Sequence, residues 1–145
     1  MMHAHATEHG KRLSQPEIVA LLRGRGINPT TQRIQIVRVL FERGTHLSAE
    51  DVFRAVNAES HHVSKATVYN TLGLLAEKGV VREVIADPTR IFYDPNTAPH
   101  HHLYDEGTGQ LTDIDAGEVQ VSGLPELPEG AMLQGVDVIV RFRAK

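Results

Sequence analysis

The sequence contains no cysteine and no tryptophan, and only 5% of its 145 residues are aromatic. Without cysteine the chain can form neither disulfide bonds nor a zinc site with thiolate ligands. It also lacks any run of about 18 apolar residues, which excludes a transmembrane helix. Residues 1–12 lack the apolar stretch of a secretory signal peptide. We therefore expect a cytoplasmic protein with an aliphatic core and no membrane partner.

Charge is unevenly distributed along the chain, although the formal net charge is only −3. Residues 1–85 carry 11 lysines and arginines against 8 acidic residues, whereas residues 86–145 carry 4 against 10. A basic front half can meet phosphate groups, and an acidic, histidine-bearing rear half can collect cations. The distribution therefore indicates two functions on one chain.

Four segments combine the apolar spacing of helices with capping residues at their ends. The first and third also place an acid three residues after the cap, which predicts a capping box. The expected N-caps are Ser14, Thr30, Ser48 and Ser64. The expected ends of the first, second and fourth helices are Gly24, Gly44 and Gly79.

The pattern changes to period two after the fourth helix, where VVREVI and RIFYD flank the turn ADPT. This alternation predicts a β-hairpin, and several helices followed by a hairpin are typical of a winged helix-turn-helix. Short strands are expected in the remainder, with the clearest alternation in GVDVIVRFR. The predicted fold class is therefore α+β. A disordered tail is expected over residues 1–12, a winged helix over 13–94 and a small α/β domain over 95–145.

The segment 64–78 has the features of a DNA recognition helix. Its apolar stripe leaves hydrogen-bond donors, a cation and an aromatic ring on or near the open face, as contacts to base edges and phosphates require. The residues expected there are Lys65, Thr67, Tyr69, Asn70 and Thr71. Backbone contacts are expected from Arg82 and Arg90 on the hairpin, and from Thr30, Gln32 and Arg33 at the start of the second helix. The alternative is that all of these are ordinary solvated side chains.

Three consecutive histidines, His100, His101 and His102, fall in a stretch expected to form a strand. Alternate residues of a strand point to the same side of the sheet. His100 and His102 can therefore bind a single ion, while His101 points the opposite way. The alternative is a polar stretch of strand without any ligand.

Three further residues extend this candidate metal site. Asp94 stands at the end of the wing, and His46 precedes the third helix. Asp113 comes alongside the histidines if the strand QLTDID pairs with HHLYD. Together with His100 and His102 they form a nitrogen- and oxygen-rich set that suits Fe(II), Mn(II) or Zn(II).

Two other classes of protein compete with a metal-binding DNA regulator. A metalloenzyme needs an open coordination position and a nearby acid or base, but the sequence offers no H-E-x-x-H or nucleophile motif. A catalytic centre also leaves the recognition helix unexplained, so no enzymatic activity is expected. A carrier of metal or haem without DNA activity stays open.

Several motifs resemble those of the ferric uptake regulator (Fur) superfamily over about residues 13–115. SKATVYNTLGLLAEKGVVRE is similar to its recognition helix and wing, with the hallmark S-x-A-T-V-Y-N/R-x-L. GINPTTQRIQIVRVL and THLSAEDVF resemble the entries to its second and third helices. FYDPNTAPHHHLYDEG and VDVIVRFR look most like the iron response regulator (Irr) branch.

The resemblance implies a homodimeric transcription regulator, a repressor or activator of iron and haem genes, that binds an AT-rich inverted repeat of double-stranded DNA. Residues 95–145 become its dimerisation and sensing domain. Its regulatory site, one divalent Fe, Mn or Zn per protomer, falls on His46, Asp94, His100, His102 and Asp113. The Irr branch implies a haem response at His100, His101 and His102, with haem or a haem-delivering protein as partner. A peroxide sensor or a manganese or zinc sensor using the same site is the alternative.

Departures from the family pattern matter as much as the matches. Tyr104 and Gly107 stand where most relatives carry the C-x-x-C of a structural zinc, so that zinc is expected to be absent. Pro99 replaces a histidine of a second metal site found in many relatives. We therefore expect a single regulatory site.

Overall fold

The computed structural model describes residues 12–58 and 62–145, which belong to two compact units. The helical unit ends at Thr97, and the C-terminal unit spans Ala98–Lys145. The sequence predicts this division after Asp94, three residues earlier than the structure has it. The expected tail, apart from Arg12, lies outside the described residues. Among the described residues, no helix is long and apolar enough to span a membrane.

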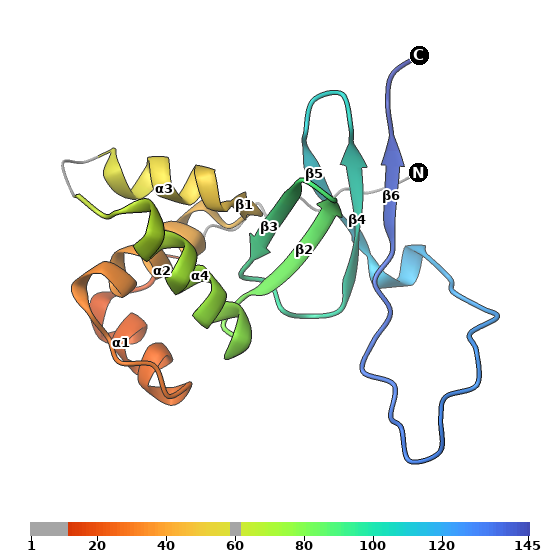
Figure 1. The fold of residues 1–145 in the computed structure, drawn as a ribbon, viewed down its shortest axis with the longest axis horizontal. Helices are drawn as coiled ribbons and strands as arrows, with labels where there is room; N and C mark the ends of the chain where they lie inside the picture. Colours follow the sequence, from red (N-terminus) through yellow and green to blue (C-terminus); the bar gives the residue numbers. More distant parts are fainter. Residues whose placement is uncertain (1–11, 59–61) are drawn as a thin grey trace. The chain divides into compact units, whose positions relative to one another are not determined.

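In the described residues, the helical unit contains four helices and a small sheet (Figure 1). The helices are α1 (Gln15–Gly24), α2 (Thr31–Arg43), α3 (Ala49–Asn57) and α4 (Lys65–Glu77). The strands are β1 (Leu47–Ser48), β2 (Arg82–Asp87) and β3 (Arg90–Asp94), with β3 between the other two. All pairings in this sheet are antiparallel. This is the winged-helix arrangement predicted from the sequence.

The helices begin at the predicted caps because short polar side chains satisfy their first N–H groups. Ser14 and Ser48 each form a full capping box, with Glu17 and Asp51 respectively. Thr30 and Ser64 accept the N–H of the third helical residue. α2 stops at Gly44, whose φ of 63° lies in the left-handed region, where glycine carries no steric penalty.

One face of every helix is packed into an aliphatic core. Ile36, Val37 and Leu40 of α2 and Leu72 of α4 are all fully buried. The other members contributed by the helices are Ile18, Leu22, Ile34, Ala49, Val52, Val56, Val68 and Leu75. Burying such a side chain contributes about 1.5–3 kcal/mol, so this core fixes the position of the exposed faces of α4 and the wing.

The C-terminal unit is a three-stranded sheet of β4 (His100–Asp105), β5 (Leu111–Asp115) and β6 (Ile139–Phe142). β4 is the central strand; β5 pairs with it antiparallel and β6 pairs with it parallel. The predicted pairing of QLTDID with HHLYD is confirmed. The alternation in GVDVIVRFR predicted a longer strand than β6. Only the second half of that segment pairs with β4.

The connection from β5 to β6 contains only the 3-10 turn η1 (Ala116–Glu118). A crossover between parallel strands usually contains an α-helix, but Pro125 and Pro128 interrupt this one. Figure 1 shows it as an extended excursion. Ala98–Lys145, all of it described, therefore has no α-helix, and the α/β class predicted for this part of the chain is wrong.

The capping box of α3 should make the stability of the fold depend on pH. Burial raises the pKa of the Asp51 carboxyl, but hydrogen bonds from Ser48 and Arg54 outweigh it and lower the pKa below the ordinary 3.8. A lowered folded pKa means that ionised Asp51 stabilises the fold above the ordinary value, and that this contribution disappears as the pH falls through the lowered one.

We therefore expect Asp51→Asn to be less stable than the parent chain at neutral pH, with a difference in free energy of unfolding that shrinks towards pH 3. Urea titrations between pH 7 and pH 3 measure this difference. Glu77→Gln is the matched control, since Glu77 is an exposed acid in the last turn of α4. A pH-independent difference for Asp51→Asn would contradict the expectation.

Candidate metal centre and nucleic-acid interface

The strand register of the C-terminal unit brings three predicted ligands together. His102 lies directly opposite Asp113 in the β4–β5 pair, and His100 lies two residues earlier on the same face. The Nε2 atoms of His100 and His102 are each 3.4 Å from the same Oδ1 of Asp113. Their rings lie edge to face with centroids 4.5 Å apart. We call these three residues the ligand trio.

The geometry of the ligand trio fits a metal ion. Nδ1 of His100 is 2.6 Å from the carbonyl oxygen of Ala98 and must donate to it, since a carbonyl can only accept. In the neutral ring Nε2 then keeps its lone pair, which faces the Asp113 carboxylate. A separation of 3.4 Å is long for a hydrogen bond. It is about the separation of two ligands on a tetrahedral ion with bonds near 2.1 Å.

All three side chains of the trio are buried. His100, His102 and Asp113 expose 6%, 1% and 4% of their surfaces. Ionised groups are rarely buried to this extent unless they are paired or coordinate a metal. The donor set of two imidazole nitrogens and one carboxylate oxygen suits Fe(II), Mn(II) or Zn(II).

The helical unit carries the other two predicted ligands as a buried pair. His46 directly precedes β1 and Asp94 ends β3, and these strands pair through Leu47 and Tyr93. The Nε2 of His46 is 3.4 Å from Oδ2 of Asp94. The other carboxylate oxygen accepts the N–H of Asn96 at 2.9 Å, which orients the group.

The middle histidine of the triplet lies on the opposite face of β4, as strand alternation predicted. Its Nδ1 accepts the backbone N–H of Val138 at 3.1 Å. A neutral imidazole whose Nδ1 accepts carries its proton on Nε2, so that nitrogen has no lone pair for iron. His100 and His102 meanwhile direct Nε2 towards Asp113. As folded, His101 therefore offers no ring nitrogen to a haem iron, and the haem site expected at the triplet stays a prediction.

The exposed face of α4 carries most of the predicted DNA-contacting residues. Lys65 and Asn70 are exposed, Thr67 is half-buried, and Tyr69 exposes 48% of its surface. Thr71, also predicted on or near this face, is buried instead, because it lies three residues after Val68 and four before Leu75, on the side of the helix that faces the core.

Several of the predicted phosphate-binding cations already have partners. Lys65 forms an ion pair with Glu50 at 3.3 Å and lies over the ring of Phe53. The guanidinium of Arg33 donates to the carbonyl of Asn28, and its backbone N–H is capped by Thr30. These contacts hold the two cations at the surface of the unit, where the ion pair is weak enough for a phosphate to replace it.

The two predicted wing arginines lie at different places on the hairpin. Arg82 begins β2 opposite Asp94, and it lines a recess with Gly73 and Glu77 of α4. Arg90 begins β3 beside the turn, opposite Asp87. Of the two arginines, only Arg90 lines the same pocket as Tyr69.

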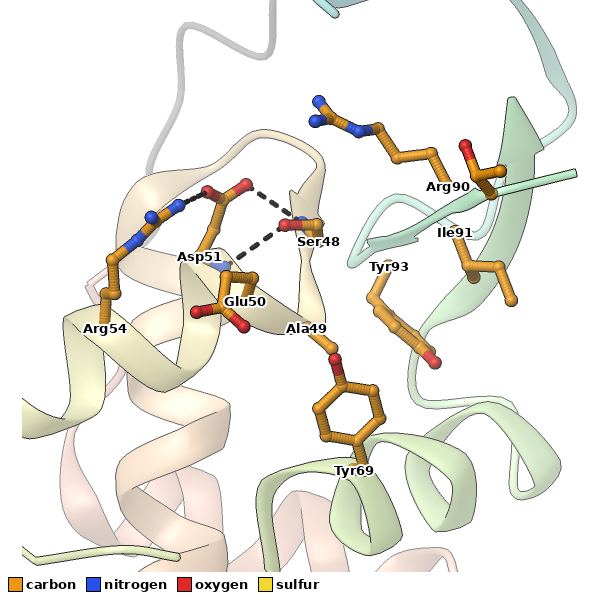
Figure 2. Close-up of a pocket in the computed structure, with 10 residues that line it drawn as sticks. Ser48, Ala49, Glu50, Asp51, Arg54, Tyr69, Arg90, Ile91 and Tyr93 are labelled. Atoms are coloured by element: carbon orange, nitrogen blue, oxygen red, sulfur yellow. Dashed lines mark hydrogen bonds and ion pairs between the residues drawn. The ribbon is translucent and has the colours of Figure 1, made fainter. Parts of the chain in front are cut away.

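A hollow of about 540 Å³ separates the start of α3 from the wing. Figure 2 shows Glu50 and Arg54 on one side, Arg90 and Tyr93 on the other, and Tyr69 reaching up from α4. Sequence reasoning did not single out Glu50, Arg54 or Tyr93, since no spacing in the sequence shows that α3 and β3 face each other. Burial, with the charges of Glu83 and Tyr69, raises the pKa of Tyr93.

Comparisons with known proteins agree with this fold. Residues 24–132 match the ferric uptake regulator family. The chain is 34% identical over 98 residues to a peroxide-responsive repressor, PerR, of Staphylococcus aureus. That match covers 68% of this chain and 66% of the relative, so the chain spans just under two thirds of the relative's length.

Solved structures show the same fold. The ferric uptake regulator of Vibrio cholerae superposes with a TM-score of 0.70 at 17% identity, covering 87% of this chain and 98% of that one. The ferric uptake regulator of Pseudomonas aeruginosa with manganese gives 0.67 at 24% identity, covering 86% and 95%. With the family match spanning most of the sequence, we conclude that this chain belongs to the ferric uptake regulator family.

Proposed function

We propose that this protein is a homodimeric, metal-responsive transcription regulator that binds double-stranded DNA. One observation carries the metal part of the proposal: two histidine Nε2 atoms stand 3.4 Å from one buried carboxylate oxygen. The exposed polar face of α4 supports the DNA part. Membership of a regulator family supports both, and it argues against the catalytic alternative.

The ligand trio and the His46–Asp94 pair are proposed to share one divalent ion per protomer, Fe, Mn or Zn. The trio offers three donors and the pair offers two, and such ions take four or more ligands, so a shared ion would have its coordination completed by protein groups. The trio belongs to the C-terminal unit and the pair to the helical unit. An ion held by both restricts their arrangement, so metal affinity becomes linked to DNA affinity.

DNA binding is assigned to α4 in the major groove of an AT-rich inverted repeat, one half-site for each protomer. Thr67, Tyr69 and Asn70 are proposed to read base edges and thymine methyl groups. Phosphate contacts are proposed for Lys65, for Thr30 and Arg33 at the start of α2, and for Arg82 and Arg90 on the wing. A regulator held on its operator by the metal acts as a repressor.

The branch of the family is proposed to be Irr-like, on the strength of the histidine triplet and the VDVIVRFR segment. The proposal includes no haem step, because Nδ1 of His101 accepts the N–H of Val138 and Nδ1 of His100 faces the carbonyl of Ala98. The peroxide-sensing alternative is favoured by the 34% identity to a peroxide-responsive repressor. Iron held by imidazoles and carboxylates offers histidine rings as targets for peroxide oxidation.

The metal site can be tested with two variants and Mn²⁺ as the probe. His102→Ala is expected to lower Mn²⁺ affinity at least about 100-fold, because it removes a ligand at the centre of the trio. His46→Ala is expected to weaken the same single site. Calorimetric titration gives affinity and stoichiometry, and a gel shift gives the metal dependence of DNA binding.

His62→Ala is the matched control, since His62 is an exposed histidine that belongs to neither donor set. It should leave both measurements unchanged. An unchanged Mn²⁺ affinity in His46→Ala would refute the shared ion while leaving the trio in place. Unchanged affinity in His102→Ala would refute the metal site itself. A metal site with no DNA shift would identify a carrier protein instead.

Tyr69→Ala tests the recognition helix. Tyr69 is half-exposed, so truncation should change the free energy of unfolding by less than about 0.5 kcal/mol. Loss of its base contact is expected to cost about 1–3 kcal/mol of binding to the specific operator. Fluorescence anisotropy with operator and with unrelated duplex measures both affinities. Equal losses on the two duplexes would remove Tyr69 from sequence readout.

Peroxide sensing predicts a covalent change at the ligand trio. Protein loaded with Fe(II) and treated with peroxide should gain about 16 Da on a peptide that contains His100 or His102, whereas protein loaded with Mn(II) should not. Mass spectrometry of the digested protein locates the added oxygen. Equal labelling with both metals, or none with iron, would exclude this alternative.

A further inference from the structure

The residue immediately before β6 is held by two neighbouring residues of β4. The N–H of Val138 donates to Nδ1 of His101 at 3.1 Å, and its carbonyl accepts the N–H of His102 at 3.0 Å. Both backbone polar groups of Val138 are thus hydrogen-bonded to β4. One of the two contacts comes from a side chain, which is unusual at the start of a strand that otherwise pairs through its backbone.

The connection that precedes β6 does little to hold the start of this strand in place. The segment that leads to it has no α-helix, and five of its large apolar side chains are exposed: Val121, Leu124, Leu127, Met132 and Leu133. A long irregular connection without buried apolar contacts contributes little to fixing its own end. The position of β6 therefore depends on its hydrogen bonds to β4.

The contact also bears on whether the middle histidine can coordinate a metal. Nδ1 can accept from Val138 only if it is unprotonated, which puts the proton of the neutral ring on Nε2. Coordination of a metal through Nε2 needs a lone pair there and the proton on Nδ1. The ring cannot then accept the Val138 N–H, so coordination by His101 and anchoring of β6 exclude each other.

We propose that His101 is a positioning residue that anchors β6, and that the histidines on the two faces of β4 have different roles. The outer histidines take the metal, while the middle one fixes the strand through Val138. This deepens the proposed function and rests on it in one respect, because His102 joins the two faces. Its side chain belongs to the ligand trio and its backbone N–H holds Val138.

A regulatory consequence follows from this shared residue. An ion at the trio fixes the His102 side chain, and with it the backbone that receives Val138. β6 presents Val140 and Phe142 with 41% and 43% of their surfaces exposed, on the same face of the sheet as His101. Metal occupancy is therefore expected to steady the strand that displays this apolar surface.

Two substitutions of His101 separate anchoring from coordination. In His101→Asn the side-chain oxygen can take the place of Nδ1 as acceptor, but no equivalent of Nε2 remains. In His101→Leu neither nitrogen is replaced. Hydrogen exchange of the backbone amides of residues 138–142 reports anchoring, and calorimetric titration with Mn²⁺ reports coordination. Titration with haemin, followed by absorbance, tests the haem alternative.

We expect His101→Leu to speed exchange over residues 138–142 about tenfold, the effect of one lost hydrogen bond to a partly buried amide. His101→Asn should rescue most of this protection. Both variants should bind Mn²⁺ within about threefold of the parent chain, since neither touches the trio. Addition of Mn²⁺ to the parent chain should slow exchange over the same residues.

Three results would overturn the proposal. Unchanged exchange in His101→Leu would show that the contact anchors nothing. A loss of Mn²⁺ affinity in His101→Asn as large as that in His102→Ala would make His101 a ligand. Selective loss of a haemin absorption band in His101→Asn would do the same.

Two provisions keep the test decisive. If circular dichroism shows that His101→Leu does not fold, the Mn²⁺ and haemin titrations of His101→Asn decide whether His101 is a ligand or an anchor of β6. If the parent chain binds no Mn²⁺, the proposed metal function fails. The exchange comparison between the two variants then still tests the anchor by itself.

Discussion

The register between β4 and β5 is the constraint on which the candidate metal site depends. It sets His102 opposite Asp113 and leaves His100 on the same face two residues away. A shift of one residue would turn both rings to the other face of the sheet and bring His101 to the carboxylate instead. The antiparallel pairing over Leu111–Asp115 therefore determines which histidines of the triplet meet the acid.

The same alternation explains why three identical side chains in a row differ in their surroundings. The outer histidines face an acid, and the donor that approaches the middle one is a backbone amide. A carboxylate favours an imidazole that is protonated or that shares a metal ion with it. An amide N–H requires an unprotonated ring nitrogen as acceptor. Local backbone geometry thus assigns each ring its chemistry before any ligand is considered.

The chain lacks cysteine, so its metal chemistry and its stability both rest on other groups. Tyr104, which stands where many relatives carry a zinc thiolate, is buried in the sheet with 3% of its surface exposed. Strand pairing and apolar packing hold that part of the C-terminal unit. A regulatory ion held by histidines and carboxylates alone is consistent with membership of the ferric uptake regulator family and with the donor set observed in each unit.

The sequence by itself determined the elements whose causes are local. The four N-caps, the stop at Gly44 and the period-two hairpin depend on neighbours within a few residues, and strand alternation separated His101 from His100 and His102. Only the tertiary structure decided what depends on contacts distant in the chain. Burial of Thr71, the separation of Arg82 from Arg90 and the hydrogen bond from Val138 to His101 all depend on how distant segments pack or pair. The last of these joins residues 37 positions apart, a distance over which no periodicity or capping rule applies.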